Sequence, residues 1–136
     1  GNFQAELAWQ QTGGGPSAYE ARPAYQNAIA VTTGAHRGTP DISAVADPTT
    51  GVWVYQGGYW WIVGGTSVAA PVWAGVINAA GHFYASSAAQ LTAMYANTAG
   101  FTNVTNGDCG PYEGYLALGA WSFCTGHGSP NGKANK

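Results

Sequence analysis

The sequence contains little charge. Lys and Arg number four and Asp and Glu six, so charged residues make up 7% of the chain, against about 25% in an average soluble domain. Four basic residues do not form a patch, and nucleic-acid binding through phosphate contacts is therefore not expected. A surface with few titratable groups suits acidic surroundings, but burial against a partner would explain it equally well.

Long hydrophobic runs are also missing. No apolar stretch reaches the roughly 20 residues that cross a bilayer, so we expect no membrane span. The chain opens at Gly1 without a signal-peptide pattern, and we expect it to be cut from something longer. Its 136 residues are enough for one domain with a modest core.

Cysteine occurs only twice, as Cys109 and Cys124. In a secreted protein such a pair is typical of a disulfide, which would contribute about 3 kcal/mol by loop entropy. Two separate buried thiols are the alternative, and a metal site is disfavoured because no histidine stands at suitable spacing. Asn103-Val104-Thr105 is an N-glycosylation sequon, usable only in a eukaryotic secretory source.

Glycine and small apolar residues are abundant around one serine. The motif Gly64-Gly65-Thr66-Ser67 precedes residues 68–80, which have almost no polar side chains and predict a helix buried nearly all round. Pro71 is expected in the first turn of that helix. A serine at the positive end of a helix suits nucleophilic attack on a carbonyl, with backbone donors nearby for the oxyanion. Alternatively, Thr66 or Ser67 merely caps the helix.

The remaining pattern predicts short elements. Residues 52–55 and 59–63 predict a hairpin that leads into the glycine motif, and residues 41–46 alternate as a strand does. Residues 24–29 predict an amphipathic turn, and Ser86-Ser87 predicts the start of a second helix. The triple glycine at 13–15 is either a wall facing a substrate or simply a loop.

Several of these stretches resemble, in order, the C-terminal part of the sedolisins, the serine-carboxyl peptidases. Gly-Thr-Ser followed by alanines and proline occurs in subtilisins too, but residues 37–51 and Trp73 are typical of sedolisins. The resemblance covers nearly the whole chain. It is carried by residues 13–17, 22–26, 37–44, 46–51, 64–67, 69–71, 73–75 and 125–130.

The resemblance implies an α/β fold with a subtilisin-like, mostly parallel sheet flanked by helices. Residues 1–136 would form only the C-terminal portion of that domain. Within it, residues 1–63 would supply loops, a short helix and the hairpin, residues 64–99 the nucleophile turn and helices, and residues 100–136 a calcium-loop-like region.

The resemblance also implies that Ser67 is the nucleophile of a secreted endopeptidase acting in acid, with Gly13, Gly14, Gly65 and Thr66 near the peptide substrate. In the family a glutamate base, its aspartate and an oxyanion aspartate come from upstream, and carboxyl groups can work where histidine would stay protonated. No acid of this chain matches those positions; the acids are Glu6, Glu20, Asp41, Asp47, Asp108 and Glu113.

Asp41 and Asp47 are therefore interpreted as hydrogen-bonding anchors, and His36 as a subtilisin-like base is disfavoured. We expect an N-terminal chain of the same peptidase to complete the site, and the isolated chain to be inactive. The alternative is a catalytically inactive homologue that acts as a binding or structural protein.

Sedolisins also bind Ca²⁺ near the C-terminus. Their two aspartates fall at Asn103 and Ser122, and their carbonyl ligands at Val104, Leu118 and Ala120. Calcium prefers anionic oxygen ligands, so replacing both carboxylates by neutral groups predicts a weak or empty site. A Cys109–Cys124 bridge would span the same loop and could fasten it instead. No other cofactor is expected.

Overall fold

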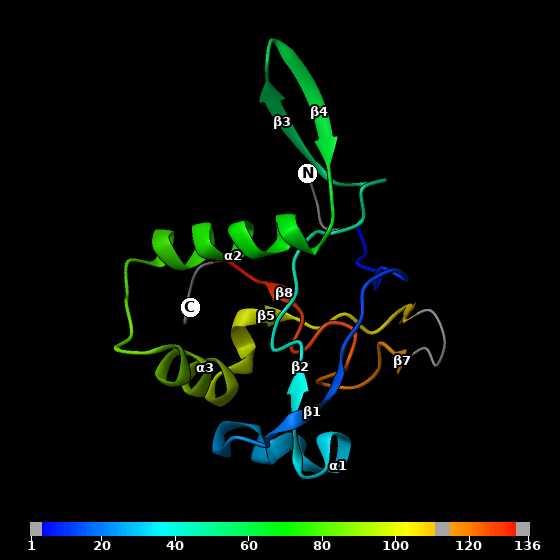
Figure 1. Ribbon diagram of the computed structural model, residues 1–136. Coiled ribbons are helices and arrows are strands. Elements are labelled where there is room, and N and C mark those ends of the chain that lie inside the picture. Colours follow the sequence, from blue (N-terminus) through cyan, green and yellow to red (C-terminus); the bar gives the residue numbers. More distant parts are fainter. Residues whose placement is uncertain (1–3, 111–114, 133–136) are drawn as a thin grey trace. The chain divides into compact units, whose positions relative to one another are not determined.

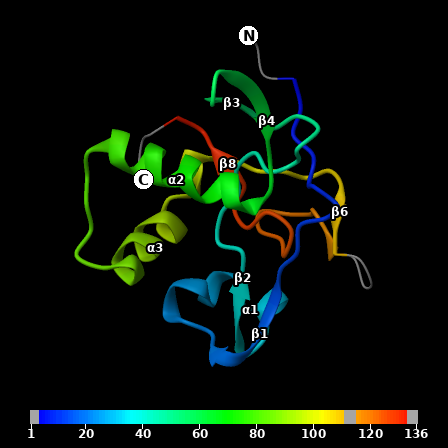
Figure 2. The ribbon, with the colours of Figure 1, turned by 45° about the horizontal axis from the view of Figure 1, so that its top comes forward.

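The computed structural model describes residues 4–110 and 115–132, drawn in colour in Figures 1 and 2. The chain forms two compact units, each built from two separate segments. The first unit consists of residues 1–42 and 103–128, and the second of residues 43–102 and 129–136.

The first unit contains short strands and helices around a small core. Its elements are β1 (Gly15–Ala21), η1 (Ala24–Ile29), α1 (Ala30–Thr33), β2 (His36–Thr39), β6 (Asp108–Cys109) and β7 (Tyr115–Leu116). The expected turn over residues 24–29 is confirmed as η1, but its predicted amphipathic character is not, because the buried residue of η1 is Gln26 and Ala28 is exposed. The core cluster consists of Cys109, Ala117 and Cys124, against which Ala8 packs.

The disulfide between Cys109 and Cys124 is confirmed, with an S–S distance of 2.10 Å and Cα atoms 5.5 Å apart. The alternative of two separate thiols is therefore wrong. Both cysteines lie in the buried core cluster with Ala117. Next to Cys124 in sequence, the ring of Phe123 lies 4.5 Å from that of Tyr115 and 5.1 Å from that of Trp121, measured between centroids. The bridge is thus part of the apolar centre of this unit.

The second unit carries the predicted hairpin and both predicted helices. Its elements are β3 (Val52–Gln56), β4 (Tyr59–Val63), α2 (Thr66–Ala80), α3 (Ser87–Ala96), η2 (Thr98–Gly100), β5 (Phe101–Thr102) and β8 (Ser129–Pro130). Gly57 and Gly58 connect β3 to β4 with φ values of +61° and +86°. Two successive left-handed residues make the two-residue turn that matches strand twist, which explains the glycine pair. Ser86 caps α3, since its Oγ accepts the N–H of Ala89 at 3.2 Å.

Helix α2 forms where the sequence predicts it, but two details differ. Pro71 lies beyond the first turn, so the Ser67 carbonyl receives no N–H from residue 71. The helix is not buried all round either: Trp73 is its one buried residue, and Ala70, Ala74 and Asn78 are exposed. The uncharged, mostly small side chains of α2 are those of a buried helix. Among the described residues, however, no element covers this exposed face.

The expected parallel sheet is not formed by the described residues. Their four sheets each have two strands, and every pair is antiparallel. The predicted strand over residues 41–46 has no ladder partner and remains irregular. A strand is defined by its partner's hydrogen bonds, so an alternating pattern without a neighbouring strand does not become one. In the described part of the chain, no helix is both long and apolar enough to cross a membrane.

Candidate active site around Ser67

The turn that precedes Ser67 depends on two glycines for different reasons. A Cβ on Gly64 would lie 2.4 Å from Cα and 2.5 Å from N of Pro48. Gly65 has φ +97°, in the left-handed region that favours glycine. Its N–H donates to the Ala46 carbonyl at 2.5 Å. Close packing and backbone conformation therefore both require glycine where the motif has it.

The loop beneath this turn is held by Asp47. Its Oδ1 accepts the N–H and the hydroxyl of Thr49, both at 2.8 Å. Its carbonyl accepts the N–H of Gly51 at 2.7 Å. The interpretation of Asp47 as a hydrogen-bonding anchor is confirmed. Asp47 shapes the loop whose neighbours, Ala46 and Pro48, contact the glycine turn.

Ser67 is the second residue of α2, and its side chain is exposed. The N-cap is Gly65, which makes no side-chain cap bond, so the alternative in which Thr66 or Ser67 caps the helix is wrong. The N–H of Val68 bonds to the Gly65 carbonyl at 2.9 Å. The first N–H groups of a helix have no acceptor within it and carry the positive end of its dipole. A hydroxyl at this position can attack a carbonyl carbon while backbone donors stabilise the oxyanion.

Trp73 fixes the first half of α2 within its unit. Its indole Nε1 donates to the Ser43 carbonyl at 2.7 Å, and its ring centroid lies 5.8 Å from that of Phe101. The same residue shares a helix with Ser67, and β4 leads directly into that helix (Figure 2). Strand, glycine turn, serine and anchored helix thus form one continuous scaffold.

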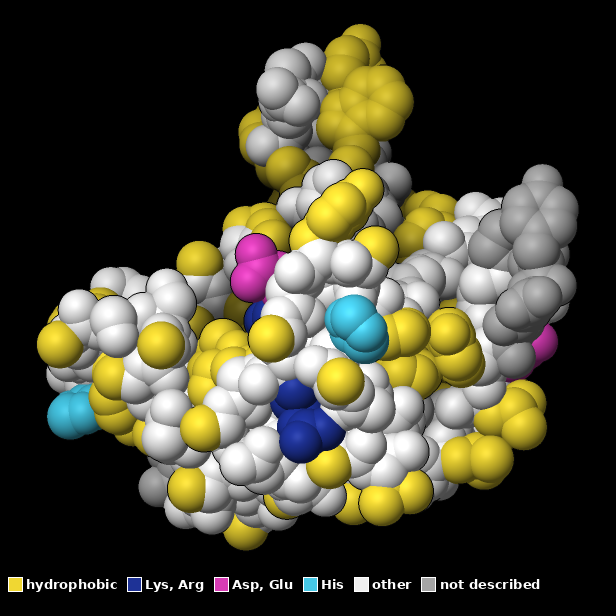
Figure 3. All heavy atoms as spheres, turned by 60° about the horizontal axis from the view of Figure 1, so that its bottom comes forward, with side chains coloured by type: hydrophobic (Ala, Val, Ile, Leu, Met, Phe, Trp, Pro, Cys, Tyr) yellow, Lys and Arg dark blue, Asp and Glu magenta, His cyan; other side chains and the backbone are white. Residues whose placement is uncertain are grey.

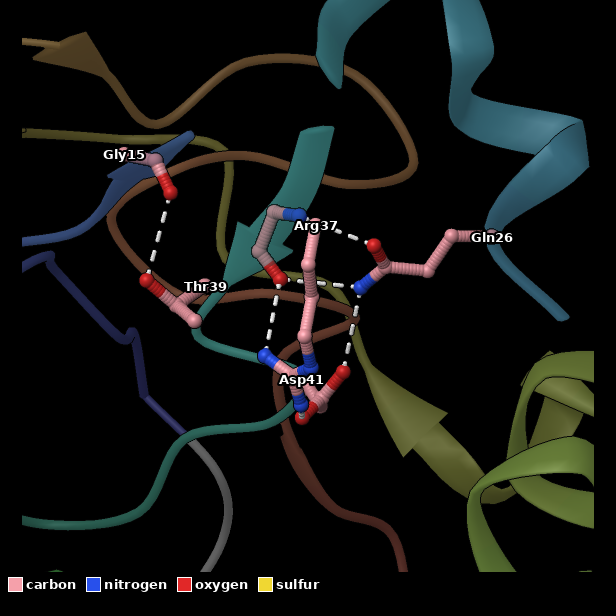
Figure 4. Close-up of polar contacts among 6 residues, drawn as sticks. Gly15, Gln26, Arg37, Thr39 and Asp41 are labelled. Atoms are coloured by element: carbon pink, nitrogen blue, oxygen red, sulfur yellow. Dashed lines mark hydrogen bonds and ion pairs between the residues drawn. The ribbon is translucent and has the colours of Figure 1, made fainter. Parts of the chain in front are cut away.

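Asp41 is the second predicted anchor, and it is also confirmed (Figure 4). Its carboxylate pairs with the Arg37 guanidinium at 2.5 Å and accepts from Nε2 of Gln26 at 3.2 Å. Burial lowers the pKa of Arg37, but the Asp41 charge and hydrogen bond, with Tyr25, more than offset this, so the net shift is upward. The neighbouring carboxylate of Asp41 thus favours the charged form of the Arg37 guanidinium.

Sequence reasoning missed Gln26, which is completely buried. Its Oε1 accepts the N–H of Gly38 at 2.8 Å, and its Nε2 donates to the carbonyl of the same glycine at 2.9 Å. The available signal was a glutamine within the stretch 22–26 that carries the family resemblance. Gln26 thus binds both backbone groups of Gly38 from a buried position.

The other acidic residues and His36 do not form a metal-binding cluster among the described residues. Glu20 lies on β1 and Asp108 on β6, Glu6 precedes β1, and His36 is exposed on β2; Glu113 lies outside the described residues. Within the part of the chain that the structure describes, no group of three or more His, Cys, Asp or Glu could hold a metal ion. The side-chain hydrogen bonds of Asp41 and Asp47 described above join them to Gln26, Arg37 and Thr49.

Gly13 and Gly14 differ in their surroundings. A Cβ on Gly14 would lie 2.0 Å from the Phe123 carbonyl oxygen and 2.3 Å from that of Thr39, whereas Gly13 faces open space. Packing alone explains why residue 14 is glycine. Only Gly13 has the open surroundings that a substrate-facing wall needs.

The sequence positions expected to bind calcium lie along two neighbouring segments. The Asn103 side-chain amide donates to the Gly119 carbonyl, and the Ser122 hydroxyl lies 3.0 Å from that of Thr125. Val104 and Ser122 are buried and Leu118 is exposed; Ala120 follows Gly119. Asn103 itself is exposed in a loop, as its sequon requires.

Comparison with known proteins gives a consistent result, although no protein-family model matches the sequence. The chain is 32% identical over 146 residues to Sedolisin of Pseudomonas sp. (strain 101), covering 95% of this chain and 24% of that protein. Kumamolisin of Bacillus sp. (strain MN-32) is 30% identical over 97% of this chain and 27% of its own length. Xanthomonalisin of Xanthomonas sp. (strain T-22) is 36% identical over 87% of this chain and 15% of its own length.

The structure comparison agrees. The chain matches Pseudomonas sedolisin, a serine-carboxyl proteinase solved with two molecules of pseudo-iodotyrostatin, with a TM-score of 0.76 and 30% identity. The match covers 94% of this chain and 39% of that one. The present chain thus spans about a quarter of the length of the first two curated relatives.

Proposed function

Because this chain belongs to the sedolisin family of serine-carboxyl peptidases, we propose that it supplies the serine nucleophile for peptide-bond hydrolysis. The observation that carries the proposal is the placement of Ser67. It is exposed at the start of α2, on a turn that Gly65 ties to Ala46 and that Gly64 packs against Pro48. A nucleophile needs such a fixed and accessible position.

The proposed reaction forms an acyl ester on Ser67 while the peptide C–N bond breaks, and then hydrolyses that ester. The Ser67 hydroxyl oxygen attacks the peptide carbonyl carbon as a carboxylate base takes the hydroxyl proton. Backbone N–H groups at the start of α2 stabilise the oxyanion, the amine leaves with a proton, and water then releases the acyl group. Gly13, Gly14, Gly65 and Thr66 are proposed to lie along the peptide, with Gly13 the better exposed of the first pair.

The base and the oxyanion carboxylate are proposed to come from the N-terminal part of the peptidase, as a separate chain or a missing segment. Two observations support this. The chain spans about a quarter of its curated relatives, and Asp41 and Asp47 are engaged as structural anchors. The mostly parallel sheet is assigned to the same missing part, which would also cover the exposed face of α2.

Two further properties belong to this proposal. A carboxylate base works in acid, where histidine would be protonated. Secretion is proposed because the structure contains the disulfide between Cys109 and Cys124, and disulfides persist in oxidising compartments. The domain assignment is a proposal as well: residues 1–136 as the C-terminal portion, with the nucleophile turn and helices at 64–99.

The test uses the protein as isolated, with any polypeptide that co-purifies identified by sequencing. A peptide aldehyde should label Ser67 at pH 3–5 when the N-terminal part is present. Ser67→Ala should abolish labelling and turnover, and Ser87→Ala, an exposed serine in the first turn of α3, is the matched control. Turnover by the 136-residue chain without any companion would contradict the proposal.

The second candidate is a catalytically inactive homologue that binds a polypeptide or carbohydrate. The observation in its favour is the hairpin: its exposed aromatic side chains are Trp53, Tyr55, Tyr59, Trp60 and Trp61. The face in Figure 3 likewise shows few charged side chains. Exposed aromatic residues gathered on one element are typical of binding surfaces. Ser67 that stays unlabelled beside a complete N-terminal part would favour this second function.

A further inference from the structure

The residues at the calcium-binding positions of the family have a role that is independent of peptidase activity. Calcium requires six to eight oxygen ligands with free lone pairs, preferably including carboxylates. In residues 103–132, as far as the structure describes them, Asp108 is the one carboxylate, and it lies in the β6–β7 ladder opposite Leu116. The donor set at the expected positions is therefore neutral.

Asn103 presents a donor where a ligand oxygen is needed. Its Nδ2 donates to the carbonyl oxygen of Gly119, between the two residues whose carbonyls the family uses, Leu118 and Ala120. An amide N–H offers that segment a partial positive charge, as a cation would, and an amide cannot serve through its nitrogen as a calcium ligand. The amide thus bridges residue 103 to the 118–120 segment.

Ser122 is engaged as well. It is 5% exposed, and its Oγ lies 3.0 Å from Thr125 Oγ1 and accepts the Thr125 N–H at 3.3 Å. Its backbone forms hydrogen bonds in both directions with Gly126, at 3.2 and 2.9 Å. The hydroxyl closes its own turn, so binding an ion would require these bonds to break.

The same two segments are joined at further points. Asp108 pairs with Leu116 and Cys109 with Tyr115, and the N–H of Ala117 bonds to the Gly107 carbonyl at 2.9 Å. The disulfide then ties Cys109 to Cys124, beside the Ser122 turn. Hydrogen bonds and one covalent bond therefore join residues 107–109 to residues 115–117 and to Cys124.

We propose that this chain has replaced the calcium site of its family by a metal-free clasp, consisting of the Asn103–Gly119 hydrogen bond, the Ser122–Thr125 hydroxyl pair and the Cys109–Cys124 disulfide. The residues do not fit a calcium ion, and the fold of this region does not depend on one. The folded protein is accordingly insensitive to chelators and sensitive to reductants.

Thermal unfolding of the protein as isolated tests the proposal. Neither EDTA nor several millimolar CaCl₂ should move the Tm by more than about 1 °C, since only a ligand that binds the folded state stabilises it. A phosphine reductant at neutral pH, or the double variant Cys109→Ser with Cys124→Ser, should lower the Tm by about 5 °C or more. A chelator-induced fall, or calorimetry that detects one tightly held Ca²⁺ per chain, would overturn the proposal.

A restoration variant provides the second arm. Asn103→Asp combined with Ser122→Asp returns both carboxylates, so its Tm should rise by several degrees with CaCl₂ and fall with EDTA. Asn106→Asp is the matched control, because it adds a carboxylate at an exposed position in the same segment and should show no calcium response. A calcium response of the control equal to that of the double variant would contradict the assignment of these two positions.

The Tm measurements on the unsubstituted protein with EDTA, CaCl₂ and reductant do not depend on whether these variants fold. None of the readouts is peptidase turnover, so a failure of the clasp leaves the role of Ser67 untouched, and an inactive Ser67 leaves the clasp untouched.

Discussion

The N–H of Gly65 donates to the carbonyl of Ala46 at 2.5 Å. This bond joins two stretches that carry the family resemblance, residues 46–51 and 64–67. It means that the loop containing Asp47, which has no catalytic role in this proposal, determines where Ser67 is held.

Gly64→Ala should destabilise the protein strongly. The new Cβ would lie within 2.5 Å of the Pro48 backbone, which cannot rotate away as a side chain could, and the expected cost is about 1–3 kcal/mol. Gly75→Ala is the matched control in α2. Its Cβ would meet nothing within 4 Å, and Ala is better than Gly inside a helix by about 0.5–1 kcal/mol. Denaturant unfolding should therefore give opposite signs for the two variants.

Asp47→Ala should cost about 1 kcal/mol by removing the oxygen that accepts the Thr49 N–H and hydroxyl. It should also slow labelling of Ser67 by an active-site probe in the complete peptidase, because the loop under the turn loosens. Asp47→Asn keeps one side-chain oxygen and should retain most of the stability. Equal losses in the two variants would show that the charge of Asp47 matters, rather than its hydrogen bonds.

Gln26→Leu should cost about 2–4 kcal/mol despite its similar size. It leaves the N–H of Gly38 without its Gln26 acceptor and removes one of two donors to the Gly38 carbonyl, the other being Arg37 Nη1 at 3.3 Å. A buried backbone group that loses its partner is costly. Gln90→Leu, a half-buried glutamine in α3, is the comparison and should cost less than about 1 kcal/mol. Chemical denaturation of both variants measures the difference.

His127 should reduce stability in acid. Burial lowers its pKa, although the Ala120 backbone and the Asp41 charge partly offset this. The folded protein therefore binds a proton less readily than the unfolded chain. Its contribution to stability is complete above the unfolded pKa of about 6.5 and is lost as the pH falls below that value.

Replacing this imidazole by a side chain that does not titrate removes the effect. In His127→Phe the fall in Tm between pH 7 and pH 4 should be smaller than in the unsubstituted protein. The comparison within each protein cancels any packing cost of the substitution, since that cost is present at both pH values. An unchanged pH dependence would show that other groups govern acid unfolding.

Local features were predictable from the sequence because each rests on few neighbouring residues. The Gly57-Gly58 turn, the Ser86 cap and the disulfide all follow from residue type and spacing. The burial of α2 was not predictable in the same way. An apolar helix is covered only if another element is present to cover it, and sequence pattern does not reveal that element.

The same limit applies to the site. The glycine motif predicted that Ser67 lies at the start of a helix, as observed. The completely buried Gln26 escaped notice because glutamine is usually exposed. Its role depends on the Gly38 backbone, twelve residues away in sequence. Contacts between distant segments of irregular backbone have no periodicity from which to infer them.

The β3–β4 hairpin has a consequence for handling the protein. Residues 48–107 include no Asp, Glu, Lys or Arg, so this stretch of the chain contributes almost no electrostatic repulsion between molecules near neutral pH. Both strands of the hairpin have an unpaired edge, since their sheet contains no third strand among the described residues, and uncharged edges readily pair with one another. Salt and pH should therefore do little to keep the isolated chain dispersed. Its colloidal behaviour depends on whether another polypeptide occupies those edges.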